Sequence, residues 1–529
     1  MESNQQPTIS VWKATYETPE RSSLTENLTA DVCIVGAGIA GISTAYRLIQ
    51  QGLSVVVVDK GPIGGGMTMQ TTAHLVNALD DRYYDLEKYH GEKGAKLAAD
   101  SHTVAVDSIE AAISSEGIDC DFERLDGYLF VPPGDSTEEL QRELAAVHRA
   151  GLTDVELIDR APIEAFDSGP CLRFPRQAQF HPLKYIAGLA RAIEKRGGRI
   201  FTGTRVTKVE GGPPARVETE AGWTITADAV VVATNTPVND VVVIHTKQAP
   251  YTTYAIGARV PRGSIAKALY WDTAQESEMA DEHGVVPYHY VRLQHGDSKL
   301  ESAANEKKYD VLIVGGEDHK TGQADDADIR YRRLEAWARE RWPMIENIEF
   351  WWSGQVMETI DGLAFIGRNP MDDKNVYVAT GDSGNGMTHG TIAGILLTDM
   401  IMGRENAWST LYDPSRKTLS AARDFASENL NVVAQFAKGY VTGGEVDSVD
   451  EVKPGEGAII RHGLKKIALY RDDKGELYKC SAVCTHLGCI VAWNSNEKSW
   501  DCPCHGSRFD SYGRVITGPA TDDLASVEE

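Results

Sequence analysis

The chain has 529 residues, enough for two or three domains that each bury a full-sized core. Asp and Glu total 77 against 53 Lys and Arg, and the formal net charge of −24 argues against nucleic acid and anionic lipid as partners. No stretch approaches the roughly 18 to 20 uninterrupted apolar residues of a membrane span, and the polar start MESNQQPT is unlike a signal peptide, so we expect a cytoplasmic protein without a membrane span.

A dinucleotide-binding pattern starts near residue 30. Residues 30–35 read as a short buried strand, Gly36-Ala37-Gly38-Ile39-Ala40-Gly41 follows, and a helical pattern continues to Ile49. The largely apolar run 53–58 then ends at Asp59, as expected of a parallel strand covered on both faces. Glycines let the backbone and a helix N-terminus approach a pyrophosphate, and the acid takes ribose hydroxyls. The pattern predicts a dinucleotide site but does not separate NAD from FAD.

Three later segments contain further motifs. Gly64-Gly65-Gly66 precedes Thr71-Thr72-Ala73-His74, and a predicted strand over 229–235 ends in Ala233-Thr234-Asn235. The third segment lies between a predicted strand at 376–380 and an apolar helix at 391–402, and it reads Gly381-Asp382-Ser383-Gly384-Asn385-Gly386-Met387-Thr388.

These segments resemble the amino-acid and amine oxidase family, the group of glycine, sarcosine and D-amino-acid oxidases, over roughly residues 28–405. The resemblance implies FAD, with loop 71–74 close to the reactive ring. It also implies that the glycine-rich helix N-terminus near residue 386 stabilises negative charge on the reduced ring. The implied FAD-binding residues are Gly36, Gly38, Ile39, Ala40, Gly41, Asp59, Lys60, Thr72, Ala73, His74, Val206, Ala233, Thr234, Asp361, Gly384, Asn385, Gly386, Met387 and Thr388.

In this family the oxidation of a C–N bond needs little acid–base machinery, because a neutral amine gives hydride to the flavin and the pocket mainly orients it. The candidate catalytic residues are His74, Asn385, His289 and Arg292. His74 and Asn385 are favoured because they belong to loops expected at the ring. Further pocket candidates are Tyr254, Tyr290 and Trp352.

Several of these positions have a plainer interpretation. His289 and Arg292 are also consistent with an exposed strand residue or a salt-bridge member, and Asp361-Gly362 with an ordinary turn. Trp351-Trp352 could form an aromatic cage for a methylated ammonium, but a packed core pair is favoured. Tyr309 to Gly316 looks like a second dinucleotide start, yet it lacks the remaining glycines. We predict an antiparallel strand there and no NAD(P)H site.

A second pattern lies near the C-terminus. Cys484-Thr485-His486 and Cys502-Pro503-Cys504-His505 give Cys-x-His followed by Cys-x-x-His. A Rieske [2Fe–2S] centre needs two thiolates on one iron and two imidazoles on the other. A zinc site or two structural disulfides are the alternatives, but zinc fingers place two Cys together and two His together. The pattern predicts Cys484, His486, Cys502 and His505 as cluster ligands, and hence electron transfer.

The motifs CTHLGC and CPCHGS resemble the Rieske proteins of cytochrome bc-type complexes. That resemblance implies a disulfide between Cys489 and Cys504, a hydrogen bond from Ser507 to a bridging sulfide, and a proline loop at 518–520 over the cluster. The family often has Tyr two residues after the serine, where this chain has Phe509. Loss of that donor to a ligand sulfur should lower the cluster's potential.

The motifs together predict an α/β FAD-binding Rossmann-like domain interleaved with an α+β substrate domain, plus a C-terminal all-β Rieske domain. We expect an FAD-dependent oxidoreductase part at 1–410, a helical linker at 411–444 and the Rieske domain at 445–529. Within the first part, nucleotide-binding segments fall at 28–75, 181–240 and 350–405. A helical, charged segment at 76–180 and a β-rich segment at 241–349 are assigned to the substrate domain.

Two functions follow from these motifs. The first is a dehydrogenase that oxidises an amine or amino-acid-like substrate at FAD and passes electrons through the Rieske cluster to an external one-electron acceptor, with a basic redox protein as one candidate. The second is a relay between partner proteins without a small-molecule substrate. The size of segments 76–180 and 241–349 favours the enzyme, because a relay needs no substrate domain. A Rieske oxygenase would need a further mononuclear iron site, which the sequence does not show.

Overall fold

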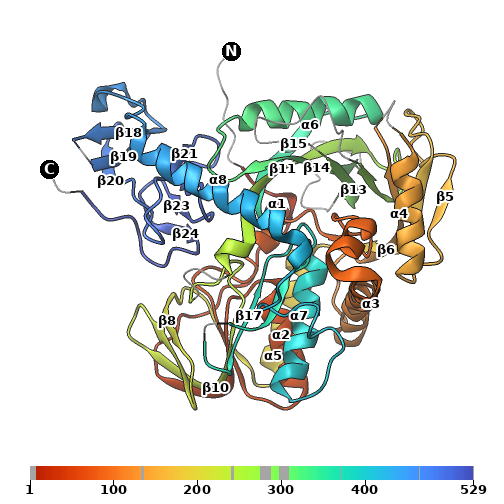
Figure 1. The fold of residues 1–529 in the computed structure, drawn as a ribbon, viewed down its shortest axis with the longest axis horizontal. Coiled ribbons are helices and arrows are strands. Elements are labelled where there is room, and N and C mark those ends of the chain that lie inside the picture. The colour runs from red at the N-terminus through yellow and green to blue at the C-terminus, as the bar shows by residue number, and fades with distance from the viewer. Residues whose placement is uncertain are drawn as a thin grey trace.

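The computed structural model describes residues 8–132, 136–239, 244–273, 288–296, 309–370, 372–463 and 465–527. Parts of the predicted segments 76–180 and 241–349 therefore lie outside the described residues. Figure 1 shows three regions: a sheet with helices at the bottom, a large curved sheet at the upper right, and a small β-rich region at the left that carries the C-terminus. This arrangement confirms the predicted fold class.

The first sheet has the order β16-β17-β10-β1-β2-β7, and its five strands from β17 to β7 are parallel. All four valines of β2 are buried: Val55 and Val57 pack on the side of the helices, and Val56 and Val58 pack on the opposite side with residues that include Val217 of β9. The strands are β1 (Leu28–Val35), β2 (Val55–Val58), β7 (Arg199–Phe201), β8 (Val206–Glu210), β9 (Ala215–Thr219), β10 (Thr224–Val232), β16 (Phe365–Arg368) and β17 (Val376–Thr380). The helices beside them are α2 (Ile39–Gln50), α5 (Pro182–Lys195) and α7 (Gly386–Ile401).

The second sheet has the order β15-β11-β14-β13-β12-β4-β6-β3, with β5 beside β6, and is antiparallel except between β12 and β4. Its strands are β3 (His74–Leu75), β4 (Glu123–Phe130), β5 (Glu156–Ile158), β6 (Cys171–Gln179), β11 (Gln248–Pro261), β12 (Leu269–Asp272), β13 (His289–His295), β14 (Tyr309–Lys320) and β15 (Ile348–Thr359). The remaining helices of this part of the chain are α1 (Val11–Thr15), α3 (Tyr83–Glu116), α4 (Glu138–Arg149) and α6 (Ala327–Arg341).

Two expectations about the second sheet can be compared with its strands. The segment that resembles a second dinucleotide start is β14, an antiparallel strand between β11 and β13, as predicted. The segment 76–180, predicted to be helical, also supplies β4, β5 and β6. Its charge pattern marked the helices α3 and α4, whereas β4 pairs with β6 of the same segment and with β12 of the segment 241–349.

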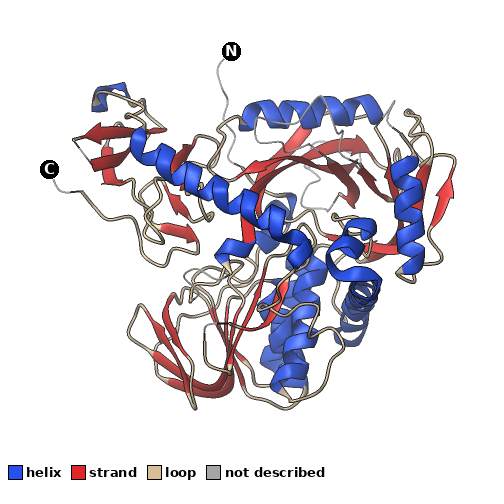
Figure 2. Cartoon of the chain, viewed as in Figure 1, coloured by secondary structure: helices blue, strands red, loops and turns tan. Residues whose placement is uncertain are grey.

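The C-terminal region consists of two small antiparallel sheets, β18-β19-β20 and β21-β22-β23-β24. Their bounds are β18 (Glu456–His462), β19 (Lys465–Arg471), β20 (Leu477–Ser481), β21 (Ala492–Asn494), β22 (Ser499–Asp501), β23 (Arg508–Asp510) and β24 (Val515–Thr517). Helix α8 (Ala422–Val441) precedes them and runs from the large body of the protein to this region, as Figure 2 shows in blue.

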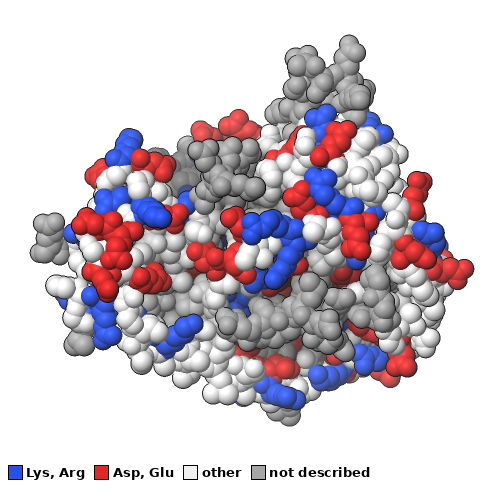
Figure 3. Space-filling model, turned by 90° about the horizontal axis from the view of Figure 1, so that it is seen from above, with Lys and Arg blue, Asp and Glu red and all other residues white. Residues whose placement is uncertain are grey.

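The surface carries both signs of charge. On the face shown in Figure 3, acidic and basic side chains are interspersed among the described residues, so the net charge of −24 is not gathered in one area of that face. No helix among the described residues is both long and apolar enough to cross a membrane.

Candidate active site and iron–sulfur site

The loop after β1 needs glycine for steric reasons. Gly36 has φ +109°, and a side chain there would collide with the carbonyl oxygen of Ala233. Helix α2 then begins at Ile39, with Gly38 as its N-cap. Both residues border a cavity, so the positive end of the helix and its first N–H groups face a space that suits a pyrophosphate.

Asp59, at the end of β2, ties this loop to the next one. Its Oδ2 accepts a hydrogen bond from the backbone N–H of Ala37 and its Oδ1 one from that of Gly61, each at 2.7 Å. Burial raises the pKa of the Asp59 carboxyl, and the two N–H donors oppose that shift. Asp59 and Lys60 both border the cavity, where the fingerprint predicts the ribose contact.

The cavity has a volume of about 800 Å³, within the roughly 300–1,000 Å³ of typical ligand sites. All three regions form its walls: loops of the first sheet, strands β11, β12, β13 and β15 of the second, and residues of the segment 514–523 in the C-terminal region. The predicted site residues that border it are Gly36, Gly38, Ile39, Ala40, Asp59, Lys60, Thr72, His74, Val206, Ala233, Thr234, Gly384, Asn385, Gly386 and Met387.

Three predicted cofactor residues lie behind the cavity wall. Gly41 stands where a side chain would collide with the backbone of the preceding turn. Ala73 is buried with φ +61°, and its carbonyl oxygen accepts a hydrogen bond from Arg292 at 2.9 Å. Thr388 Oγ1 lies 2.8 Å from Nδ1 of His102. These residues shape the loops that border the cavity.

Asp361 also lies away from the cavity lining. Its carboxylate forms two hydrogen bonds with Arg416, at 2.6 and 2.8 Å, and accepts a third from Thr418 at 2.5 Å. Burial by itself would raise the pKa, but the Arg416 charge lowers the pKa of Asp361 to about 2. Of the two interpretations of Asp361-Gly362, the geometry fits a structural turn.

His74 and Asn385 border the cavity, but contacts within the protein already involve both ring nitrogens of His74 and the amide nitrogen of Asn385. Nδ1 of His74 lies 3.1 Å from Thr72 Oγ1, and its Nε2 lies 3.2 Å from the carbonyl oxygen of Val291. Burial, with the nearby Arg292 charge, lowers the pKa of His74 to about 3, so the ring is neutral. Asn385 donates to the carbonyl oxygen of Ser383 at 3.0 Å. Both residues therefore serve as cavity wall.

His289 lies outside the cavity lining and within a buried charge cluster. Its Nδ1 is 2.8 Å from Asp272 Oδ2, its Nε2 is 3.7 Å from Glu317 Oε1, and its ring stacks on Trp337 at 4.2 Å. Burial lowers the pKa, but the two carboxylates outweigh it and raise the pKa of His289 to about 9. The salt-bridge interpretation fits this geometry.

Arg292 is completely buried and also lies outside the cavity lining. Its Nη1 donates to the carbonyl oxygens of Ala73 and Phe180, both at 2.9 Å, and of Thr72 at 3.3 Å, and its Nη2 donates to Gln294 Oε1 at 2.6 Å. The guanidinium therefore holds loop 71–74 from behind. It is a positioning residue for that loop.

Two carboxylates in the cavity wall were not predicted. Asp80 follows β3 and accepts a hydrogen bond from the Tyr288 hydroxyl at 3.3 Å, and Asp382 lies before α7. Burial is the main reason that the pKa of each rises to about 6. In the sequence, Asp80-Asp81-Arg82 is typical of a polar turn. Only the packing of β13 and α7 against this turn shows that Asp80 borders the cavity.

The four predicted cluster ligands converge in two loops. The thiols of Cys484 and Cys502 are hydrogen-bonded to each other, which lowers the pKa of Cys484 to about 7. The rings of His486 and His505 lie 5.0 Å apart, and Nδ1 of His505 is buried without a hydrogen-bond partner among the described residues. Two paired thiols, two adjacent imidazoles and an unused buried nitrogen fit a Rieske [2Fe–2S] cluster.

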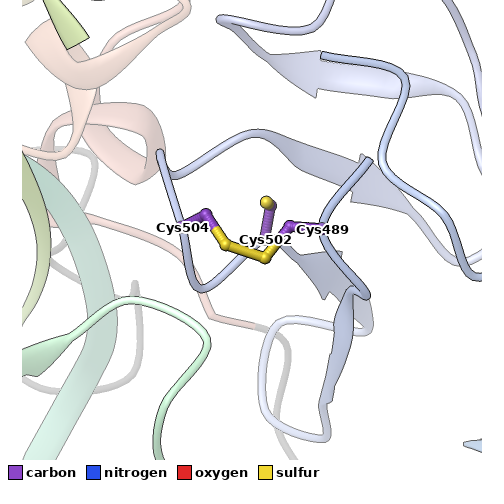
Figure 4. A group of neighbouring side chains, drawn as sticks. All are labelled: Cys489, Cys502 and Cys504. Atoms are coloured by element: carbon purple, nitrogen blue, oxygen red, sulfur yellow. A yellow bond between two sulfur atoms is a disulfide. The ribbon is translucent and has the colours of Figure 1, made fainter. Parts of the chain in front are cut away.

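A disulfide joins the two cluster loops. Figure 4 shows Cys489 and Cys504 bonded across the loops, with Cys502 beside them. Their Cα atoms are 6.4 Å apart. The buried Ser507 hydroxyl accepts a hydrogen bond from Ala520 N at 3.0 Å, which attaches the proline loop to the second cluster loop.

The cluster loops are packed against the large body of the protein. His245, at the start of the short helix His245–Lys247, lies with its ring 4.9 Å from that of His486 and 6.1 Å from that of His505. Gln355 of β15 donates to the carbonyl oxygen of Gly506 at 2.9 Å and also borders the cavity. Neither contact was predicted, because nothing local in the sequence marks a docking surface between domains.

The cavity also fits FAD. Its basic lining residues, Lys60, Arg205 and Arg514, can balance a diphosphate, and two helix N-termini border it, those of α2 and α7. The residues 514–523 that complete the wall come from the Rieske region; Arg205 pairs with Asp523 at 3.2 Å. Fold and site together define a flavoprotein oxidoreductase joined to an iron–sulfur domain.

Comparisons with known proteins agree with this class. Residues 31–400 match the family model described as FAD dependent oxidoreductase, and residues 444–528 match the model of the Rieske [2Fe-2S] domain. The chain thus belongs to the FAD-dependent oxidoreductase family and carries a C-terminal Rieske domain. Its cofactors are FAD and a [2Fe–2S] cluster, and its activity is that of an oxidoreductase of the amino-acid and amine oxidase type.

Two curated proteins and one solved structure show how far the similarity extends. YhfW of Bacillus subtilis (strain 168), named as a Rieske 2Fe-2S iron-sulfur protein, is 30% identical over 518 residues, 98% of this chain and 97% of the relative. Gamma-glutamylputrescine oxidoreductase of Escherichia coli (strain K12) is 28% identical over 392 residues, 72% of this chain and 85% of the relative. Glycine oxidase from Geobacillus kaustophilus superimposes with a TM-score of 0.59 at 19% identity, covering 74% of this chain and 100% of that one, and so shares the fold.

Proposed function

We propose that this protein is a dehydrogenase that oxidises the C–N bond of an amine or amino-acid-like substrate and delivers the electrons to an external one-electron acceptor. When bound, FAD supplies the hydride acceptor and the Rieske cluster a one-electron carrier. The observation that carries the proposal is the shared wall: one cavity is bordered by the dinucleotide loops, by the second sheet and by residues of the segment 514–523 in the Rieske region.

The substrate part of the cavity is built to orient a small molecule. Tyr290 of β13 and Trp352 of β15 border it, and the Tyr290 hydroxyl lies 2.6 Å from Thr253 Oγ1. Trp352 Nε1 donates to the carbonyl oxygen of Gln70 at 2.8 Å. These side chains are fixed by the protein and exclude water from the space beside loop 71–74, which is what hydride abstraction requires of a pocket.

The docked cluster loops support the route by which electrons leave. His505 is only 8% exposed, and its ring and that of His486 pack near His245 of the large body. Gln355 contacts both the cavity and the backbone beside His505. A short, packed connection of this kind favours transfer within one chain over a relay between separate proteins.

The test is anaerobic mixing of the purified protein with a panel of amines and amino acids while flavin absorbance and the EPR signal of the reduced cluster are followed. We expect one substrate class to bleach the flavin and the cluster signal to follow. If no compound reduces the flavin but a protein reductant reduces the cluster first, the relay is the better function.

A cluster variant separates the two halves of the proposal. Cys502→Ser should abolish the cluster, leave substrate-driven flavin bleaching intact, and stop turnover with a one-electron acceptor. Cys480→Ser is the matched control, because Cys480 is a buried free cysteine of the same region and is not a predicted ligand. Undiminished acceptor turnover in Cys502→Ser would contradict the proposed route.

A further inference from the structure

Charged side chains line both parts of the cavity, and the part that faces the segment 514–523 holds the acids Asp59, Glu220 and Asp523 as well as basic residues. The basic residues of the cavity, Lys60, Arg205 and Arg514, all belong to the part that faces the segment 514–523: Lys60 Nζ lies 3.4 Å from the Val515 carbonyl oxygen, and Arg205 pairs with Asp523. Along the second sheet and the start of α7, the charged residues that border the cavity are Asp80 and Asp382. This part of the described cavity, which includes the start of α7 where the flavin ring is expected, is therefore acidic.

Asp80 and Asp382 flank the turn that begins α7. Side chains at Gly384 and Gly386 would collide with the carboxylates of Asp80 and Asp382 respectively, so glycine at both positions makes room for them. Among the described residues, Asp80 accepts one hydrogen bond, from Tyr288. The side chain of Asp382 accepts one from Met357 N at 3.4 Å. Both carboxylates keep oxygen lone pairs for a ligand.

Three more acids lie near these two. Asp318 and Asp81 have pKa values raised to about 7, and the pKa of Glu358 is raised well above its usual value, in each case first by burial and then by neighbouring carboxylates. Oδ1 of Asp318 is buried and has no hydrogen-bond partner in the part of the chain that the structure describes. None of the five acids forms an ion pair among the described residues. The nearby Arg82 donates to the carbonyl oxygens of Leu79 and Asp272.

The Arg82 charge opposes the raised pKa of Asp80 and Asp81 without forming an ion pair with either. Half-buried carboxylates of this kind are costly to ionise, because desolvation and mutual repulsion both oppose their ionisation. A cation bound in the cavity would relieve that cost. A carboxylate bound there would add to it, and the buried Arg292, close to loop 71–74, donates to backbone carbonyl oxygens behind the wall. The cavity therefore discriminates by charge between an amine and an α-amino acid.

We propose that the substrate is an amine cation that carries no carboxylate, with its ammonium group held by Asp80 and Asp382. This inference rests on the proposed function and names its substrate class. The Tyr288 hydroxyl, hydrogen-bonded to Asp80, fixes the orientation of the first carboxylate. Asp81 and Asp318 behind them add to the negative potential of the pocket in their ionised forms.

The test uses matched pairs that differ by one carboxylate: 1,5-diaminopentane against lysine, and 2-phenylethylamine against phenylalanine. Binding to the FAD-loaded protein is measured anaerobically by calorimetry in two buffers of different ionisation enthalpy, and flavin bleaching is followed in parallel. We expect the amine of at least one pair to bind ten-fold or more tightly than its amino acid. We also expect binding at pH 7 to release protons, because a bound cation lowers the pKa of Asp80 and its neighbours.

Variants test the assignment to these residues. Asp80→Asn keeps the shape of the side chain and removes its charge, and it should weaken amine binding ten-fold or more while the FAD content stays unchanged. If this variant loses FAD, Asp382→Asn is measured in its place. Asp100→Asn, on the exposed side of α3, is the matched control and should change nothing. Unchanged amine affinity in both cavity variants would overturn the inference.

The outcomes distinguish this inference from the proposed function. If amino acids bind and bleach the flavin while their matched amines do not, the dehydrogenase stands and the acidic pocket has been misassigned. If neither member of any pair binds or bleaches the flavin, the proposed function and the inference fail together.

Discussion

Replacement of Arg292 by methionine tests whether this residue positions loop 71–74 or binds substrate. Methionine keeps most of the apolar stem but removes the guanidinium. The carbonyl oxygens of Ala73 and Phe180 and Gln294 Oε1, which accept at 2.9, 2.9 and 2.6 Å, then lose their donor in a buried place. Each such loss costs about 1–2 kcal/mol, so the three together predict a destabilisation of about 3–6 kcal/mol.

That magnitude is large against the roughly 5–15 kcal/mol that stabilises a typical domain. The protein has several regions that need not unfold together, so urea unfolding should be followed separately by flavin fluorescence and by the visible absorbance of the cluster. We expect the flavin signal to shift to lower urea while the cluster signal moves less. We also expect weaker FAD retention, because Ala73 and Thr72 belong to the loop at the cavity.

Arg149→Met is the control, because Arg149 forms an ion pair with Glu87 at 2.6 Å on the surface, with 44% of its side chain exposed. Exposed pairs contribute roughly 0–1 kcal/mol, so this variant should be nearly neutral. The reasoning is refuted if Arg292→Met is as stable as the control and instead selectively loses affinity for substrates that bear a carboxylate. Arg292 would then be a substrate-binding residue, and the acidic-pocket inference would fall with it.

Three further predictions concern single side chains. The pKa of His289 is raised to about 9, so its ion pairs with Asp272 and Glu317 stabilise the fold fully below about pH 6.5 and lose this effect as the pH rises through 9. We therefore expect His289→Gln to flatten the dependence of the urea midpoint on pH between 6 and 10. Phe509→Tyr should raise the midpoint potential of the cluster in protein-film voltammetry, because it restores the hydrogen-bond donor that bc-type proteins often have. An unchanged potential would show that the hydroxyl does not reach a ligand sulfur. Ser507→Ala should lower that potential, and it also removes the acceptor for Ala520 N; a potential that stays constant while the loop loosens would limit Ser507 to a structural role.

Local patterns in the sequence were sufficient to predict both cofactor motifs. Gly36, Gly38 and Asp59 border the cavity as the fingerprint predicts, because the strand–turn–helix geometry that they require is encoded within thirty neighbouring residues. Cys484 and Cys502 form their hydrogen-bonded pair, and the disulfide between Cys489 and Cys504 is present in the structure. The order of the motifs along the chain was also sufficient to predict the fold class.

Side chains whose roles depend on partners from other regions were not predictable in this way. His289 and Arg292 are residue types that often occur in catalytic sites. In the structure, however, His289 pairs with Asp272 and Glu317, and Arg292 donates hydrogen bonds to carbonyl oxygens of loop 71–74. Asp361 resembles part of a flavin-contacting turn in the sequence, but in the structure its carboxylate binds Arg416, which lies outside that turn. A sequence states which groups are present, but burial and charge pairing decide which of them stay available.

The sequence by itself therefore determined the two cofactors, because each motif satisfies its steric and ligand requirements within a short stretch of chain. Only the tertiary structure decided what surrounds them. It placed Asp80 and Asp382 on one cavity wall, turned Arg292 away from that wall, and packed His245 against the cluster loops. These arrangements arise from contacts between residues hundreds of positions apart, whose geometry is set by the packing of two sheets and a small domain and leaves no periodic signal in the sequence.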